Sequence, residues 1–291
     1  RKKLERMFVY RHTVTQNDLR HSVRFKNASK VHVAITGGNG LIGSALAVFL
    51  SLQGHRVSIL SRSGSSAVFG VRGVRWNPSK KYIDPDLGPV DAWIHLAGEN
   101  LAQGRWTENR MEVLRASRIE VTQFLSDYIL AQNKAPQVFI SASGTGFYGA
   151  TKKETSESAS KGNGFLADVC ESWENASNGL RDAGIRRVII RTGVVLDRNG
   201  GALAKLLPVF QTGFGGRVGR GDQYWAWIAM DDLLRVYDSA ISDRSMGGVF
   251  NAVAPEAITN ADFSRTLGEV LKRPAVLPIP ASVLKVTIGR M

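Results

Sequence analysis

The stretch that decides the fold is Val31-His-Val-Ala-Ile-Thr-Gly-Gly-Asn-Gly-Leu-Ile-Gly-Ser-Ala-Leu46. Its first six residues form a short β-branched run, which predicts a strand. The helical spacing of apolar residues over 41–52 predicts a helix directly afterwards. Between the two elements, Gly37, Gly40 and Gly43 have the Gly-x-x-Gly-x-x-Gly spacing. Such glycines let a chain turn sharply, approach a pyrophosphate closely and pack a helix against a strand.

The predicted helix begins with Leu41, Ile42 and Gly43. The first backbone N–H groups of a helix lack partners within it, so these three residues are the expected ligands of a dinucleotide pyrophosphate. The alternative is a purely structural turn. We favour the dinucleotide site because a strand precedes the glycines and an amphipathic helix follows them.

The end of the second predicted strand, residues 57–60, is where the 2′ group of a dinucleotide is bound in such units. Proteins that prefer NAD have an acidic residue at this place. This chain has Ser61-Arg62-Ser63 instead, with no acidic residue nearby. The planar guanidinium of Arg62 suits a phosphate and Ser61 adds a hydroxyl, so the sequence predicts NADP rather than NAD. The alternative is that Arg62 is an ordinary exposed loop arginine.

Strands alternate with helices over most of the chain. Apolar runs predict further strands at 74–76, 91–97, 138–143 and 187–191, and helical periodicity predicts helices at 108–132 and 165–181. This alternation is typical of an α/β fold of the Rossmann type, a doubly wound parallel sheet. Beyond residue 196 the pattern becomes irregular, with helices expected at 231–242 and 260–271.

We therefore divide the chain into three parts: a basic connector over 1–30, an NADP-binding domain over 31–196, and a small substrate-side lobe over 197–291. The connector holds nine Lys or Arg residues and two acidic ones, a large share of the net charge of +13. Thr15 and Asp18 have capping-box-like spacing before a short expected helix that ends near Phe25. Nucleic-acid binding is disfavoured because no recognition motif accompanies the charge.

Composition excludes several classes of protein. Hydrophobic residues make up 43% and charged residues 22%, as in an ordinary globular protein. The chain has no apolar run of about 18 residues, the length expected of a membrane-spanning helix. Cys170 is the only cysteine, so no intramolecular disulfide and no cysteine-based metal site is expected. A reducing compartment, the cytoplasm, is the expected location.

Further motifs occur in a fixed order: Ile94-His-Leu-Ala-Gly-Glu99, Ser141-Ala-Ser-Gly-Thr-Gly-Phe-Tyr-Gly149, Phe165-Leu-Ala-Asp-Val-Cys-Glu-Ser-Trp-Glu174, Arg191-Thr-Gly-Val-Val-Leu196 and Tyr224-Trp-Ala-Trp-Ile228. Together with residues 36–43 they resemble the extended short-chain dehydrogenase/reductases. Within these, the chain is similar to the NAD-dependent epimerase/dehydratase branch of nucleoside-diphosphate-sugar epimerases and cell-division-inhibitor-like proteins. The resemblance covers roughly residues 31–291.

The resemblance has implications for the cofactor, the substrate and the ends of the chain. It implies that Leu96, Ala97 and Gly98 lie against the cofactor, and that the substrate is a small sugar-like or cyclic molecule. Residues 6–12 resemble the connector of fusions with an upstream cyclase-like domain, and the family continues past the position of Met291. A homodimer or another protein partner is compatible with this family.

The family's usual proton-transfer pair is a Tyr followed by a Lys four residues later, where the cation makes the phenol a usable acid/base. The resemblance places Phe165 and Val169 at these positions, and neither can transfer a proton. The remaining candidates are Ser143, which would orient the substrate oxygen, and Tyr148, which would relay a proton or stack. The alternative makes Ser143 a strand-end hydrogen bonder and Tyr148 a packing residue, and the sequence does not decide between the two.

Other side chains leave the same choice open. Glu171 and Glu174 are three residues apart, which suggests either paired carboxylates or a charged solvent-facing surface. Trp225 and Trp227 are expected to line the substrate cleft. Two functions follow: an NADP-dependent oxidoreductase or epimerase, or a non-catalytic NADP-binding regulator that acts through protein partners, as the missing Tyr–Lys pair suggests.

Overall fold

The computed structural model describes residues 2–101, 103–151 and 154–277. The main strands are β1 (His32–Thr36), β2 (Arg56–Ser61), β3 (Arg72–Asn77), β4 (Tyr82–Ile83), β5 (Ala92–His95), β6 (Val138–Gly144), β7 (Arg187–Thr192) and β11 (Gly248–Ala252). Short strands are β8 (Val194–Leu196), β9 (Tyr224–Trp225), β10 (Trp227–Ala229) and β12 (Ile258–Thr259). The α-helices are α1 (Lys2–Arg24), α2 (Leu41–Leu52), α3 (Glu108–Leu130), α4 (Phe165–Asn175), α5 (Asn178–Asp182), α6 (Gly201–Gln211), α7 (Met230–Ser242) and α8 (Asn260–Leu271).

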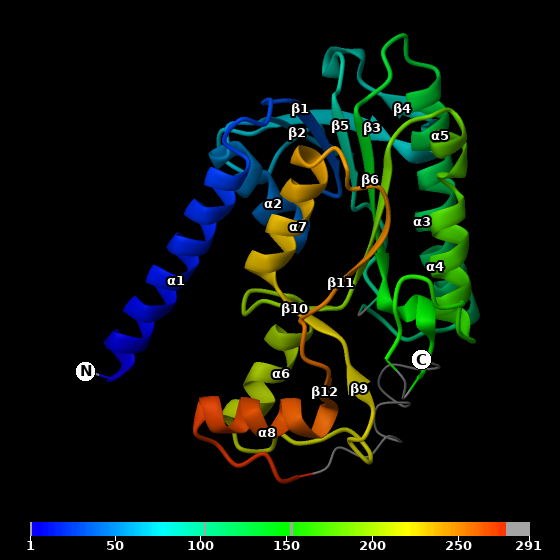
Figure 1. Cartoon of the computed structure of the whole chain (residues 1–291). Helices are drawn as coiled ribbons and strands as arrows, with labels where there is room; N and C mark the ends of the chain where they lie inside the picture. The colour runs from blue at the N-terminus through cyan, green and yellow to red at the C-terminus, as the bar shows by residue number, and fades with distance from the viewer. Residues whose placement is uncertain (1, 102, 152–153, 278–291) are drawn as a thin grey trace.

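The main strands form one sheet in the order β11-β7-β6-β5-β1-β2-β3-β4 (Figure 1). Neighbouring strands are parallel except β3 and β4, which are antiparallel. The chain builds outward from β1 in one direction through β3, then crosses to β5 and builds outward in the other. This is the predicted Rossmann-type doubly wound sheet, and ligands bind such sheets at the carboxyl edge where the order reverses.

Helices cover both faces of the sheet. Leu46 and Leu50 of α2 and Leu233 and Tyr237 of α7 pack on one face. On the other face the apolar core includes residues of α3 and α5, among them Leu125. Because both faces are covered, every residue of β1 is buried, and its three central residues, Val33 to Ile35, are all apolar.

The predicted helix over 165–181 is two helices, α4 and α5, and the prediction of one continuous helix was wrong. The break at Ser177 leaves carbonyls without helical partners. Arg187 of β7 donates to Glu174 O at 2.8 Å and to Ser177 Oγ at 3.1 Å. A cation from a neighbouring strand therefore stabilises the break.

The chain leaves the sheet after β7 and later returns to it. The short strand β8 pairs with β10, and β9 pairs with β12, in a lobe that also holds α6 and α8 (Figure 1). Helix α7 and strand β11 then rejoin the main sheet, although they come from the segment beyond residue 196. Residues 278–291 of the predicted lobe lie outside the described residues.

The N-terminal segment is one helix of 23 residues, α1, so the expected short helix from Thr15 was wrong. Asp18 lies inside this helix and pairs with Arg235 of α7 at 2.8 Å. His21 Nε2 lies 2.6 Å from Asp238 of the same helix. These two contacts hold the C-terminal half of α1 against α7. Neither α1 nor any other described helix is long and apolar enough to span a bilayer.

Candidate functional site

The glycine-rich turn between β1 and α2 packs so tightly that three of its glycines have no room for a side chain. Gly37 has φ +71°, and a Cβ there would lie 2.8 Å from the carbonyl of Leu96. A Cβ on Gly38 would lie 2.6 Å from the side chain of Ile59, and one on Gly43 would lie 2.4 Å from Gly37 O. The turn is therefore packed closely against the ends of β2 and β5.

Gly40 has a different role in this turn. A Cβ there would meet Gly37 O only at 3.2 Å, and its N–H donates to the same oxygen at 3.0 Å. Gly40 is the N-cap of α2, and no side chain caps the helix there. The N–H groups of Leu41, Ile42 and Gly43 thus stand at a helix N-terminus without a side-chain cap, which is the arrangement that binds phosphate.

A serine-rich turn follows β2 beside the glycine-rich turn. Ser61 Oγ donates to Ser65 O at 2.6 Å, and the hydroxyls of Ser63 and Ser65 are 2.6 Å apart. Asn39 of the glycine-rich turn donates to Ser65 O at 3.1 Å and so joins the two turns. Arg62 is exposed at this place. The structure therefore brings the residues predicted for the pyrophosphate and for the 2′ group side by side.

The residues that directly follow β5 line the same carboxyl edge of the sheet, and we call residues 96–98 the floor of the site. Leu96 N donates to Thr36 O at 3.1 Å, and Ala97 N donates to Thr36 Oγ1 at 3.3 Å. Gly98 lies against the guanidinium of Arg118, since a Cβ on it would be 3.3 Å from Cζ. Leu96 and Ala97, two of the three residues predicted to touch the cofactor, therefore adjoin the glycine-rich turn, and Gly98 follows them against Arg118.

A buried histidine orients this floor. His95 Nδ1 lies 2.7 Å from Thr36 Oγ1, and Nε2 lies 2.9 Å from Thr122 Oγ1. Because Thr122 already donates to Arg118 O, Nε2 carries the proton and Nδ1 accepts from Thr36. Burial, aided by the charge of Arg118, lowers the pKa of His95 to about 3. His95 therefore stays neutral and fixes the Thr36 hydroxyl.

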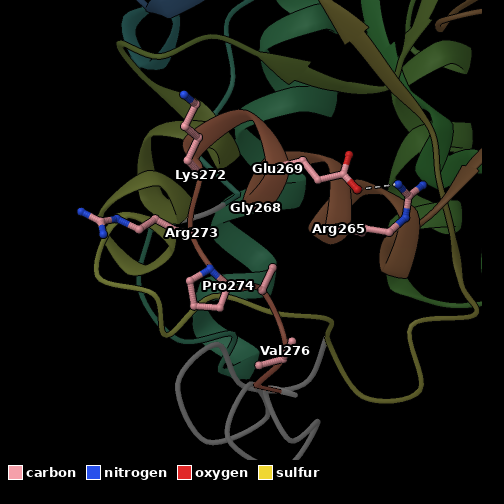
Figure 2. Close-up of a pocket in the computed structure, with 8 residues that line it drawn as sticks. Arg265, Gly268, Glu269, Lys272, Arg273, Pro274 and Val276 are labelled. Atoms are coloured by element: carbon pink, nitrogen blue, oxygen red, sulfur yellow. Dashed lines mark hydrogen bonds and ion pairs between the residues drawn. The ribbon is translucent and has the colours of Figure 1, made fainter.

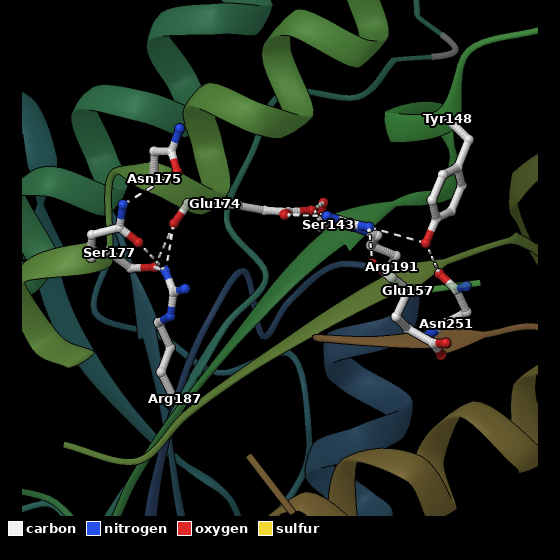
Figure 3. A network of polar contacts seen from close by, with 10 residues as sticks. Ser143, Tyr148, Glu157, Glu174, Asn175, Ser177, Arg187, Arg191 and Asn251 are labelled. Atoms are coloured by element: carbon white, nitrogen blue, oxygen red, sulfur yellow. Dashed lines mark hydrogen bonds and ion pairs between the residues drawn. The ribbon is translucent and has the colours of Figure 1, made fainter. Parts of the chain in front are cut away.

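Ser143 and Tyr148, the predicted catalytic residues, belong to one polar network (Figure 3). Ser143 Oγ donates to Glu174 Oε1 at 2.6 Å. Arg191 grips the same carboxylate with two bonds, Nε to Oε1 at 2.9 Å and Nη2 to Oε2 at 2.8 Å. Arg191 Nη1 also donates to the Tyr148 hydroxyl at 3.0 Å, and that hydroxyl donates to Asn251 Oδ1 at 2.7 Å. The network joins β6, β7, α4 and β11.

The network places a permanent cation beside the tyrosine. Burial acts against the charged form of Arg191, but its bonds to Glu174 and Tyr148 outweigh burial and raise its pKa. Its guanidinium also lies 3.3 Å from the ring centroid of Phe147. In the expected Tyr–Lys pair, the lysine is the cation that contacts the phenol. Here the cation in contact with the tyrosine is Arg191, which lies on a strand and not on a helix.

The two glutamates of α4 neither form a carboxylate pair nor share a solvent-facing surface. Both predictions for Glu171 and Glu174 were therefore wrong. Glu174 is buried against Arg191, whereas the side chain of Glu171 is 46% exposed and lies 3.2 Å from Lys161. Helix α4 begins at Phe165, whose ring packs edge-on against Trp106 at 5.6 Å. Val169 is buried.

The tryptophans expected in the substrate cleft pack within the smaller lobe. The ring of Trp225 lies 4.3 Å from that of Phe263 on α8. Trp227 is on β10, and its Nε1 is buried without a hydrogen-bond partner among the described residues. A shallow hollow lies beside the last turn of α8, where Arg265 and Glu269 pair at 3.0 Å (Figure 2). The residues that line it are not among those predicted for the cofactor.

Comparison with known proteins identifies the family. Residues 33–165 match the model of the NAD dependent epimerase/dehydratase family. An epimerase family protein of Mycobacterium leprae is 37% identical over 263 residues, which cover 89% of this chain and 84% of the relative. This chain belongs to the NAD dependent epimerase/dehydratase family.

Two solved structures of similar proteins support the same assignment. The crystal structure of the human epimerase family protein SDR39U1 with NADPH has a TM-score of 0.81 and 33% identity, over 89% of this chain and 86% of that one. A nucleoside-diphosphate sugar epimerase from Corynebacterium glutamicum has a TM-score of 0.75 and 36% identity, over 96% of this chain and 60% of that one. The resemblance to epimerase/dehydratase proteins is therefore confirmed at the level of the family.

Several site residues of this epimerase family member were not predicted. Arg191 and Asn251 hold the Tyr148 hydroxyl, and His95 and Arg118 support the floor after β5. A polar residue within an apolar strand run, such as His95, is a usable sequence signal because a buried polar group requires a partner. No sequence signal connects Asn251 with Tyr148, which lies more than a hundred residues earlier.

We expect Gly43→Ala to be far more damaging than Gly40→Ala. The added methyl of Gly43→Ala would overlap Gly37 O, and such overpacking costs about 3 kcal/mol. At Gly40 a Cβ would lie 3.2 Å from Gly37 O, so the neighbour needs to move only slightly, and φ is −79°; alanine should therefore cost about 1 kcal/mol. Urea unfolding of both variants measures the difference, and equal losses of stability would contradict the packing described here.

We expect His95 to make the protein less stable in acid. Its pKa in the folded state, about 3, is below the unfolded value, so only the unfolded chain takes up its proton as the pH falls. Its contribution is complete above about pH 6.5 and is lost toward acid at about 1.4 kcal/mol per pH unit. Unfolding free energies measured from pH 7 to 4 should fall less steeply in His95→Gln than in the wild type. Parallel curves would contradict a neutral His95.

Proposed function

We propose that this chain binds NADP(H) at the carboxyl edge of the sheet and acts as an NADP-dependent oxidoreductase or epimerase on a small sugar-like or cyclic substrate. One observation carries the proposal: the glycine-rich turn places the N-terminus of α2, which has no side-chain cap, next to the serine-rich turn that carries the exposed Arg62. A side chain on Gly37, Gly38 or Gly43 would clash with the neighbouring chain, so the turn can pack this closely only with glycine at these positions. That the human relative was crystallised with NADPH supports the same cofactor.

Charge favours NADP over NAD. No Asp or Glu occurs between Asp18 and Asp84, a stretch that includes the glycine-rich turn, α2, β2 and β3. Recognition of a free ribose 2′-OH uses an acidic residue at the end of β2, and this chain has none there. A guanidinium with nearby hydroxyls is instead complementary to the dianionic 2′-phosphate, because it offers several charge-assisted hydrogen bonds.

In the proposed reaction a bound nicotinamide would supply or accept a hydride. The protein's own part is to hold the substrate oxygen and to move a proton at it. We assign the proton to the Tyr148 hydroxyl, which Arg191 and Asn251 hold in position. Ser143 would act indirectly, because its hydroxyl orients the Glu174 carboxylate. The smaller lobe would contribute residues that bind the substrate. For this, Tyr148 must exchange its bond to Asn251 for one to the substrate.

A second candidate function has an observation of its own. Phe165 and Val169 lie one helical turn apart at the start of α4, where the family's usual tyrosine and lysine would be, and neither side chain transfers protons. A protein that binds NADP(H) without turning over a substrate could act as a regulator through a protein partner. The two candidates share the cofactor site and differ only in turnover.

We expect Arg62→Ala to weaken NADPH binding by roughly tenfold to a hundredfold, because charge-assisted bonds to the phosphate are lost. NADH binding should change by less than about twofold, since NADH lacks that phosphate. Fluorescence titration of both nucleotides measures this. If neither nucleotide binds the wild-type protein, the proposed function is wrong.

We expect Tyr148→Phe to lower turnover by roughly a hundredfold, because proton transfer to or from the substrate is lost. NADPH affinity should stay at the wild-type value. Oxidation of NADPH by a panel of cyclic ketones and epimerisation of nucleoside-diphosphate sugars in the presence of NADP(H) provide the assays, and Tyr224→Phe, at an exposed tyrosine, is the matched control. Unchanged turnover in Tyr148→Phe would contradict its role. Tight NADPH binding without turnover in the wild type would favour the regulator.

A further inference from the structure

Strand β3 continues the surface on which the glycine-rich turn lies. In the pairing of β2 with β3, Ile59 is opposite Gly73 and Ser61 is opposite Arg75. Opposite residues of parallel neighbours point to the same face, as do residues two apart in one strand. Gly38 rests directly on Ile59. Gly73 and Arg75 therefore lie on the same face of the sheet as the glycine-rich turn.

The serine-rich turn lies directly on this part of β3. A Cβ on Gly73 would be 2.5 Å from Gly64 O and 2.6 Å from Ser65 C, so the turn contacts the strand where the side chain is missing. A Cβ on Gly64 would be 3.2 Å from Arg75 Cβ. Arg75 therefore borders the turn from β3, while Arg62 belongs to the turn itself.

Both arginines are exposed and carry an uncompensated charge. Within the described ranges, neither guanidinium has a carboxylate or hydrogen-bond partner. Arg72 of the same strand differs, because it donates to Asp86 O at 2.7 Å. A hydrogen bond to the backbone thus explains Arg72, whereas no contact among the described residues explains the Arg75 guanidinium.

We propose that Arg75 is a second specificity residue, which binds the 2′-phosphate of a 2′-phosphorylated adenosine together with Arg62. The inference rests on the proposed NADP(H) site and extends it to a residue on a different strand. A 2′-phosphate has nearly two negative charges, so two arginines match it better than one.

The test compares Arg75→Ala with Arg56→Ala, which removes the same charge from the exposed opposite end of β2. Titrations use NADPH, NADH, 2′,5′-ADP and 5′-AMP. For Arg75→Ala we expect roughly tenfold weaker binding of NADPH and of 2′,5′-ADP, with NADH and 5′-AMP changed by less than about twofold. Arg56→Ala should bind all four as the wild type does, and Arg75→Lys should recover part of the loss.

Other results would overturn the proposal in distinguishable ways. If Arg62→Ala loses NADPH and Arg75→Ala does not, Arg75 has no part in the site, although the NADP(H) function stands. Equal weakening of NADPH and NADH in Arg75→Ala would mean a general effect of charge or folding, not recognition of the 2′-phosphate. If the wild type binds no nucleotide, both the function and this inference fail.

Discussion

The site depends on one steric constraint, the close packing of the glycine-rich turn between β2 and β5. Gly38 lies on Ile59 and Gly37 lies on the carbonyl of Leu96, at distances that no side chain would permit. This contact directs the N-terminus of α2 toward the carboxyl edge of the sheet. It also brings the serine-rich turn and the residues after β5 to the same place. The phosphate-binding geometry is therefore a consequence of backbone packing more than of any single polar residue.

Electrostatics divides the edge into two regions of different character. Near β2 and β3, arginines are exposed and the local sequence has no acidic residue, which is a setting for an anionic ligand. Near β6 and β7, the charges are buried and paired, as Arg191 and Glu174 show. A buried ion pair gains little net stability, because desolvation offsets the attraction. Its effect is geometric: it fixes the position of the Tyr148 hydroxyl among β6, β7 and β11.

Prediction from the sequence was most accurate where the signals are local. The bounds of α2 and α8 are as expected, because apolar spacing defines α2 and Thr259 with Asp262 forms a capping box at the start of α8. Prediction was wrong where a residue far away in the sequence changes the local structure. The predicted helix over 165–181 is broken because Arg187 stabilises the carbonyl freed at the break. Helix α1 is longer than expected, and its ion pairs with α7 come from residues more than two hundred positions away.

The sequence by itself determined the doubly wound sheet, the glycine-rich turn and the cationic residue after β2. These features depend on periodicity and on residues that are close in the chain. Only the tertiary structure decided which polar groups meet. It joined Ser143 and Tyr148 through Arg191 and Glu174, and it separated Glu171 from Glu174. The physical reason is that buried polar groups must be paired, and the partner is chosen by which strands and helices the fold brings together.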